Sequence, residues 1–560
     1  MVPDDDRHAT RRHGSARQNH DREQTVSSAI AATAIEHSSV PSASPSRSGG
    51  RRSDPWVIAL LATAISAGWS GRPSFWFDES ATISAAARRT LPQLWTLLGH
   101  IDAVHGFYYL LMHGWFTLVE PTEFWSRLPS ALSIGAAAAG VVVLCRQFLG
   151  SAPVTAGGVS PRFAALSCGV VFAILPRVTW AGVEARSSAL SIAVATWLTV
   201  LFVTAARRNR PRLWMFYAPV VMLSILVNLN TILLIPVHAV MLPLLVEAGR
   251  RRSSMLAWAA STSGAIAAMT PFLLFAHGQV FQVDWIRGLT RSVFLDVVHR
   301  QYFDYSVPFA VLSGAIVVAA LITVWRGGPR LADGGRRLLL ATIAWVVVPT
   351  ATILAYSGFV EPVYFPRYLI FTTPAAAIIV TLCIVIVTRR PWAIALAIAL
   401  FAVAAFPNYY FTQRGPYAKE GWDYSRVADL IGSHAAPGDC LVVDNTVPWR
   451  PGPIRALLAA RPEAYRGLRD VERGFSGPDV GALWDGHIAV WLTTSTINSC
   501  TTVWTITNRD RVLPDHQTGQ SLPPGTAFGR SPAYRFPGYL GFRIVERWQF
   551  NYSQVLKSTR

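Results

Sequence analysis

The chain has 560 residues, of which 51% are hydrophobic and 15% are charged, and its net charge is +18 at pH 7. A mean hydropathy of +0.33 is too high for a soluble protein of this size, so the composition excludes a purely soluble enzyme and indicates an integral membrane protein. The positive charge lies in short Arg clusters between apolar runs, which is typical of membrane topology and gives no sign of a nucleic-acid partner. The bias toward Arg and Ala is typical of a GC-rich genome and favours an actinobacterial source.

Residues 1–54 are polar, and they are rich in Arg, His, Ser and Asp without apolar periodicity. Such a segment buries too little apolar surface to offset the entropy of ordering, so we expect a disordered cytoplasmic tail. The first apolar run follows Arg51 and Arg52 and is not succeeded by a convincing small-residue cleavage site. It therefore predicts a retained first span and not a cleaved signal peptide.

About eleven apolar runs long enough to cross a bilayer lie between Trp56 and Phe406. They predict an α-helical polytopic membrane domain over residues 55–406, with membrane lipids as its surroundings. The predicted spans cover residues 55–71, 127–146, 162–176, 187–206, 213–228, 231–247, 255–275, 308–325, 338–356, 367–388 and 392–406.

The Arg clusters predict the orientation of these spans. With the N-terminus in the cytoplasm, every cluster between spans falls on the cytoplasmic side, as the positive-inside rule requires. The apolar stretch His105–Val119 would reverse all later clusters if it were a further span, so we expect an interfacial or re-entrant helix there. The predicted location is the plasma membrane, with these polar residues at the outer face: Asp78, Glu79, Asp102, His105, Glu184, Arg186, Asn228, Asn230, Asp284, Glu361 and Arg367.

Residues 407–560 have lower hydropathy and predict a small extracytoplasmic α/β domain. Short apolar runs predict strands at 440–443, 488–492 and 503–506, with helices at 424–432 and 454–460. An outer compartment permits a disulfide between Cys440 and Cys500. Two buried free thiols remain the alternative.

Asp78 and Glu79 stand between the first two predicted spans. Apolar residues recur at helical spacing over Ser80–Leu98, which predicts an amphipathic helix on the membrane surface. Acids at a helix start are also explained by capping and by the helix dipole. Asp102 and His105 follow in the same connection, and this cluster of ionisable groups favours a catalytic role.

The motifs of this region resemble those of a known superfamily. Trp-Phe-Asp78-Glu79, the segment from Asp102 to His113, Arg127-Leu-Pro-Ser130, Glu184-Ala-Arg186, and Phe365-Pro-Arg367-Tyr368 occur in the order found in GT-C glycosyltransferases. The pattern is most similar to protein O-mannosyltransferases and the aminoarabinose transferase of lipid A. The resemblance extends through Trp422 and Pro437-Gly438-Asp439, over most of residues 55–445. Such enzymes take a sugar from a polyprenyl-phosphate carrier at the outer face of the membrane.

The resemblance implies that Asp78 activates the acceptor hydroxyl and that Glu79 is its companion. Arg367 and Arg186 are the candidates for binding the donor phosphate, since a guanidinium presents forked donors to phosphate oxygens. An arginine at the headgroup level is also explained by contact with lipid phosphates. The candidates for acceptor or sugar binding are Asp102, His105, Tyr108 and Tyr364.

The sequence contains no Walker loop, no dinucleotide fingerprint and no tight metal-binding pattern. We expect no tightly bound cofactor and leave open a weakly bound divalent cation. The predicted activity is an inverting transfer of mannose from a polyprenyl-phosphate sugar to an envelope glycan, lipoglycan or protein, as in actinobacterial envelope assembly. The alternatives are an arabinofuranosyltransferase of the same superfamily, a polytopic transporter or lipid flippase, and a non-catalytic assembly protein.

Overall fold

The computed structural model describes residues 52–560 except 156–157, 329–330, 447–453, 512–517 and 521–525. The predicted disordered tail of residues 1–54 therefore lies almost wholly outside the described residues. Asp54 is the first residue of helix α1 (Asp54–Ala67), and its carboxylate pairs with Arg146 and Arg162. These contacts fix the start of the first apolar helix.

Within the described residues, seven helices are long and apolar enough to cross a membrane. They are α5 (Glu123–Leu149), α8 (Ser188–Arg208), α11 (Ala248–His277), α14 (Val307–Trp325), α15 (Asp333–Phe359), η5 with α16 (Pro366–Thr372 and Thr373–Val387), and α17 with η6 (Pro391–Pro407 and Asn408–Thr412). The shorter apolar helices are α1, α6 (Pro161–Ile174), α9 (Pro211–Val227), and η2 with α10 (Leu229–Leu233 and Leu234–Leu245). These eleven segments coincide in position with the eleven predicted spans, and seven of them are long and apolar enough to cross a membrane, so the chain is a helical polytopic membrane protein.

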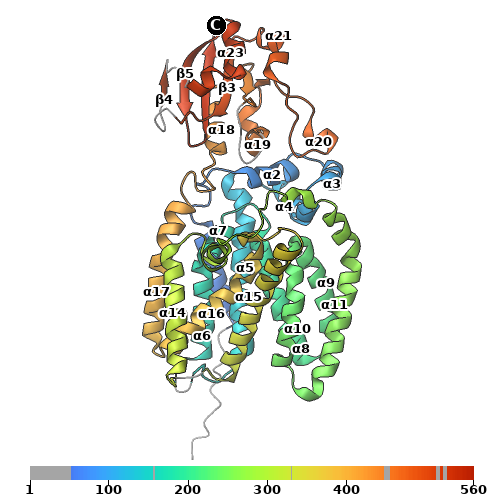
Figure 1. Ribbon diagram of the computed structural model, residues 1–560, viewed down its shortest axis with the longest axis vertical. Helices are drawn as coiled ribbons and strands as arrows, with labels where there is room; N and C mark the ends of the chain where they lie inside the picture. Colours follow the sequence, from blue (N-terminus) through green and yellow to red (C-terminus); the bar gives the residue numbers. More distant parts are fainter. Residues whose placement is uncertain (1–51, 156–157, 329–330, 447–453, 512–517, 521–525) are drawn as a thin grey trace, which may run out of the picture. The chain divides into compact units, whose positions relative to one another are not determined.

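Helix α5 lies against α1, α6 and α8. Figure 1 labels α5, α6 and α8 within the helical part of the chain. Small residues allow these backbones to approach closely, as is common between membrane helices. A Cβ added to Gly135 would stand 2.1 Å from the Thr63 hydroxyl oxygen of α1, and one added to Gly140 would stand 2.7 Å from Thr196 of α8. Larger side chains at these two positions would force the helices apart.

Three short helices connect α1 to α5: α2 (Phe77–Ala86), α3 (Leu91–His100) and α4 (Gly106–Phe116). The single amphipathic helix predicted over Ser80–Leu98 is wrong, because Thr90 and Gln93 form a capping box that starts a new helix. Almost every residue of α2 is buried, so α2 does not lie on a surface as an amphipathic helix would. Helix α4 has 11 residues and is not among the apolar helices that could cross a membrane, so the structure gives no further span at this position. Its interfacial or re-entrant location stays a prediction.

Short helices also fill two longer connections. Helix α7 (Pro176–Ala181) follows α6 directly. The connection from α11 to α14 contains η3 (Val280–Val283), α12 (Val293–Leu295), η4 (Asp296–Arg300) and α13 (Gln301–Phe303).

The C-terminal region forms a six-stranded sheet in the order β2-β1-β3-β6-β5-β4. Strand β1 pairs in parallel with β2 and β3, and the remaining pairs are antiparallel. The strands are β1 (Cys440–Val443), β2 (Arg469–Asp470), β3 (Thr502–Asn508), β4 (Thr518–Gln520), β5 (Arg543–Gln549) and β6 (Ser553–Thr559). The helices are α18 (Tyr424–His434), α19 (Arg455–Ala460), η7 (Pro462–Tyr465), α20 (Gly477–Val480), η8 (Val490–Leu492), α21 (Thr494–Ile497), α22 (Thr526–Gly529) and α23 (Pro532–Tyr539).

The predicted strands at 440–443 and 503–506 and both predicted helices are confirmed in this region. The strand predicted at 488–492 is wrong, because residues 490–492 form the 3-10 helix η8. Cys440 and Cys500 are joined by a disulfide, which decides between the two alternatives for these thiols. The bond ties the start of β1 to the segment just before β3.

Candidate active site

Helix α2 begins with two acids that meet different partners. Asp78 and Glu79 stand in its first turn, where unpaired backbone N–H groups and the helix dipole favour negative charge. Neighbouring residues on a helix point about 100° apart, so they do not share a face. The two carboxylates consequently enter different surroundings.

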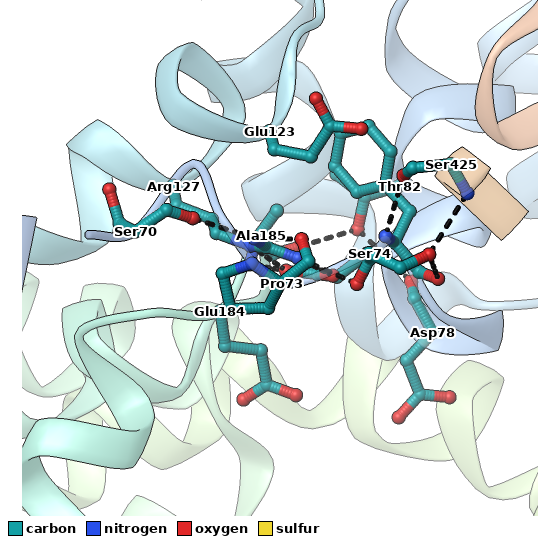
Figure 2. A network of polar contacts seen from close by, with 12 residues as sticks. Ser70, Pro73, Ser74, Asp78, Thr82, Glu123, Arg127, Glu184, Ala185 and Ser425 are labelled. Atoms are coloured by element: carbon teal, nitrogen blue, oxygen red, sulfur yellow. Dashed lines mark hydrogen bonds and ion pairs between the residues drawn. The ribbon is translucent and has the colours of Figure 1, made fainter. Parts of the chain in front are cut away.

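The Glu79 carboxylate forms a forked ion pair with Arg127 of α5, and both side chains are fully buried. Its oxygens lie 2.6 and 2.7 Å from the guanidinium nitrogens, and Oε1 also accepts the backbone N–H of Ala185 at 2.9 Å. The Arg127 guanidinium also donates hydrogen bonds to the backbone carbonyls of Ser70, Pro73 and Ser74 (Figure 2). This network binds the connection before α2 to α5 and to the segment before α8.

The Asp78 carboxylate instead pairs with Arg367 at the start of η5. Its Oδ2 lies 3.1 Å from an Arg367 guanidinium nitrogen, and each side chain keeps 19% of its surface exposed. The guanidinium centre also lies 5.4 Å from the ring centroid of Trp76 and 5.1 Å from that of Phe365. Aromatic rings therefore hold Arg367 in place while the ion pair stays open to a ligand.

A second polar chain runs from α4 to the segment before α8. The Tyr109 hydroxyl donates to Asp102 at 2.8 Å and accepts from Arg186 at 2.9 Å. A second nitrogen of Arg186 lies 2.9 Å from Nε2 of His105, and because guanidinium only donates, this ring nitrogen is the acceptor. Burial, together with the charge of Arg186, lowers the pKa of His105, so its imidazole is neutral at neutral pH.

Glu184 brings a further carboxylate to this region. It is buried, and its side chain accepts a hydrogen bond from Ser188 at 3.3 Å. Its carboxylate and that of Asp78 project on the same side of the Glu79–Arg127 network (Figure 2). Burial raises the pKa of Glu184 to about 7, although Lys419 and Arg367 act in the opposite direction.

The structure thus joins most of the predicted site residues in two groups. Asp78 contacts Arg367, and Arg186 links His105 to the Tyr109–Asp102 pair. Electrostatic interactions of Arg186 with Asp78 and Glu184 connect the groups.

Two predicted tyrosines belong to neither group, although Tyr108 interacts electrostatically with Arg186 and Glu184. Tyr108 lines an apolar groove of about 340 Å³ between α4 and α5, together with Leu111 and Ser130. Tyr364 donates to Gln301 at 3.1 Å, in a separate polar cluster that also contains Tyr302.

Several residues of this region were not among the predicted site residues. Tyr109 and Arg127 stand inside the motifs noted in the sequence, but Arg186 and Glu79, with which they interact, are distant in the chain. Lys419 and Glu420 follow the last apolar helix, and Lys419 acts electrostatically on Glu184 while Glu420 acts on Arg367. The rarity of lysine, with Lys419 and Lys557 its two occurrences, was the one sequence signal that distinguished Lys419.

No group of three or more His, Cys, Asp or Glu side chains that could hold a metal ion occurs in the described part of the chain. The weakly bound divalent cation stays a prediction.

The side chains of the site are suited to proton transfer and phosphate binding, because the partly exposed carboxylate of Asp78 lies next to the guanidinium of Arg367.

No family model matches the sequence, and no curated protein matches it significantly. Among solved structures, the fold is similar to that of Cupriavidus metallidurans ArnT bound to undecaprenyl phosphate, with a TM-score of 0.52 and 13% identity over 90% of this chain and 97% of that chain. ArnT is a GT-C glycosyltransferase, so the resemblance inferred from the motifs is confirmed at the level of the fold.

Two further matches are more distant. The oligosaccharyltransferase of Archaeoglobus fulgidus gives a TM-score of 0.39 at 11% identity, over 80% of this chain and 67% of that one. The arabinosyltransferase EmbB of Mycobacterium smegmatis gives 0.38 at 14% identity, over 86% of this chain and 40% of that one. Scores this low do not establish a shared fold.

Proposed function

We propose that this protein is an inverting glycosyltransferase that moves mannose from a polyprenyl-phosphate donor to an envelope glycan, lipoglycan or protein acceptor. The observation that carries the proposal is the Asp78–Arg367 pair, in which a carboxylate and a guanidinium lie 3.1 Å apart and both remain partly exposed. The reaction needs these two groups, one to take a proton and one to hold a phosphate. The membrane fold shared with ArnT supports a lipid-linked donor, since that structure contains undecaprenyl phosphate.

In the proposed reaction the acceptor hydroxyl loses its proton to the Asp78 carboxylate as its oxygen attacks the anomeric carbon. The bond between that carbon and the phosphate oxygen breaks, and the electron pair leaves with polyprenyl phosphate. Arg367 stabilises the negative charge that grows on the leaving phosphate. One displacement with one base inverts the anomeric configuration.

The predicted topology puts this chemistry at the outer face of the plasma membrane. The Arg clusters predict a cytoplasmic N-terminus and an extracytoplasmic C-terminal domain over residues 407–560, with the membrane domain over 55–406. Reporter fusions near Arg210 and Asp284 test this orientation. We expect Arg210 inside and Asp284 outside, and the reverse result would move the proposed site to the cytoplasmic face.

Reconstitution of the full chain in proteoliposomes tests the activity. We expect polyprenyl-phosphate mannose to be consumed with release of polyprenyl phosphate, and the product linkage to have the opposite anomeric configuration to the donor. Consumption of polyprenyl-phosphate arabinofuranose instead would replace mannose by the alternative sugar. Movement of the intact lipid across the bilayer without bond cleavage would favour a flippase and contradict the proposal.

The acceptor is best identified in cells. Comparison of the envelope glycans of a deletion strain with those of its parent should show one missing mannose-containing product. An unchanged set of envelope glycans and glycoproteins would contradict the proposed acceptor class.

A further inference from the structure

Lys419 is a buried cation whose amine has no hydrogen-bond partner. Its side chain is 2% exposed, and no described group accepts a hydrogen bond from its Nζ atom. The nitrogen lies 4.5 Å from the ring centroid of Trp180, a cation–π contact that leaves its N–H donors unused. Of the 50 Lys and Arg residues of the chain, only two are lysines, and Lys419 is one of them.

An unpaired ammonium in a buried site is unfavourable unless a partner arrives. The nearby acids are largely engaged: Glu79 is held by Arg127, and Asp304 pairs with Arg177 at 3.0 Å. Glu184 and Glu420 also interact electrostatically with Lys419, but no carboxylate of the described residues lies within the 4.0 Å of an ion pair with it. The amine therefore retains hydrogen-bonding capacity for an anion.

The turn that carries Lys419 is held rigidly. Glu420 and Gly421 have φ values of +54° and +88°, and a left-handed conformation at a Glu is a strained feature that often marks functional sites. Asn551 donates to the carbonyl of Gly421 at 2.6 Å, and Asp423 accepts the backbone N–H groups of Tyr552 and Ser553 at 2.8 Å. The turn between β5 and β6 thus fixes the position of Lys419.

Lys419 and Arg367 both act on the same carboxylate. Glu184 interacts electrostatically with each of these cations, and Arg367 is the partner of Asp78. The two cations come from different parts of the chain, one from the start of η5 and one from the turn after η6. Two cations that approach one carboxylate from different segments are suited to bind an anion with several charged oxygens, such as a phosphate.

We propose that Lys419 binds the phosphate monoester of the polyprenyl carrier together with Arg367. This inference rests on the proposed function and adds a phosphate-binding residue to it. Lysine is suited to the task because its ammonium donates up to three hydrogen bonds as a compact point charge. The phosphate supplies the partner that the buried amine lacks.

Binding by purified full-length protein in nanodiscs tests this assignment. The probes are undecaprenyl phosphate, undecaprenol and inorganic phosphate, and the matched variants are Lys419→Met, Lys419→Arg and Lys557→Met. Lys557 is the other lysine of the chain and lies 3.7 Å from Glu546 in the C-terminal sheet. We expect Lys419→Met to weaken undecaprenyl phosphate binding by roughly tenfold or more, with undecaprenol binding and the Lys557→Met protein unchanged.

The different probes and variants distinguish a failure of the proposed function from a failure of the role of Lys419. Wild-type protein that binds undecaprenyl phosphate no better than undecaprenol contradicts the proposed function itself. Wild-type preference for the phosphate together with full affinity in Lys419→Met contradicts only the role of Lys419. Equal loss of undecaprenyl phosphate and inorganic phosphate binding in Lys419→Met identifies the headgroup as the ligand, whereas unchanged inorganic phosphate binding limits the site to the lipid.

A second measurement does not depend on the folding of Lys419→Met. Burial lowers the pKa of Lys419 to about 8, against the effects of Glu184, Glu79 and Asp304, while the charge of Arg127 adds to the lowering. Lys419 therefore loses its charge as the pH rises through that value, and wild-type affinity for undecaprenyl phosphate should fall between pH 7.5 and about 9.5. Lys419→Arg should flatten this fall because its guanidinium stays charged, and an identical pH profile in both proteins would overturn the assignment.

Discussion

Asp78 and Glu79 are neighbours in the sequence, yet they occupy opposite kinds of environment. Glu79 is fully buried against Arg127, and its oxygens are taken up by the guanidinium and a backbone N–H. Asp78 makes one ion pair with Arg367, and both partners keep 19% of their surface exposed. The first turn of α2 thus contains one enclosed carboxylate and one accessible carboxylate.

The difference indicates separate roles. A fully buried carboxylate that accepts three hydrogen bonds is poorly placed to take a proton from a substrate, whereas a partly exposed carboxylate with a single ion-pair partner can do so. We therefore propose that Glu79 positions the start of α2 and that Asp78 acts as the base. The predictions below test this division.

The largest effect is expected for Arg127→Ala. The substitution leaves Glu79 buried without its partner, which destabilises a protein by about 3–5 kcal/mol. The folded fraction after detergent extraction and the thermal midpoint measure this loss. The control is Arg466→Ala, which breaks an exposed pair with Glu463 and should cost about 1 kcal/mol or less. Similar thermal midpoints for the two variants would show that the Glu79–Arg127 pair stabilises the protein no more than an exposed ion pair does.

A smaller effect, confined to function, is expected for Arg367→Ala. Its charge meets the donor phosphate in both the ground state and the transition state, so donor affinity and turnover should both fall, turnover by roughly a hundredfold. Donor binding and initial rates in proteoliposomes measure the two quantities. Arg336→Ala is a suitable control, because that side chain is exposed and lies 3.8 Å from Asp333. Unchanged donor affinity in Arg367→Ala would return Arg367 to a structural role.

The smallest effect is a pH dependence of stability from Glu184. Burial raises its pKa from 4.5 to about 7, so the folded protein binds more protons than the unfolded chain between these values. Stability from this group is therefore present below pH 4.5 and is lost as the pH rises through 7. The thermal midpoint of Glu184→Gln should fall less over this range than that of the wild type. Parallel pH profiles would show that Glu184 titrates normally.

Much of this architecture is predictable from local patterns. Each of the eleven predicted spans corresponds to an apolar helix, because hydropathy over some 20 residues is a strong signal. The break between α2 and α3 was also readable, since Thr90 and Gln93 have the spacing of a capping box. The run 488–492 misled because five apolar residues fit a strand and a short helix equally well.

The site was only partly predictable. Asp78 and Arg367 were chosen separately from motifs, but their contact joins residues 289 positions apart in the chain, and no local pattern encodes it. The burial of Glu79 and the unused amine of Lys419 likewise depend on tertiary packing. Residue type and order therefore indicated the chemistry, whereas the division of work between neighbouring acids required the structure.

The catalytic role of Asp78 is tested most directly by the turnover of Asp78→Asn in proteoliposomes containing the polyprenyl-phosphate sugar donor and an acceptor. We expect a folded protein that binds donor with nearly wild-type affinity but loses turnover by roughly a hundredfold or more, because the lost base acts on the acceptor in the transition state. Wild-type turnover by a correctly folded Asp78→Asn protein would contradict the central claim.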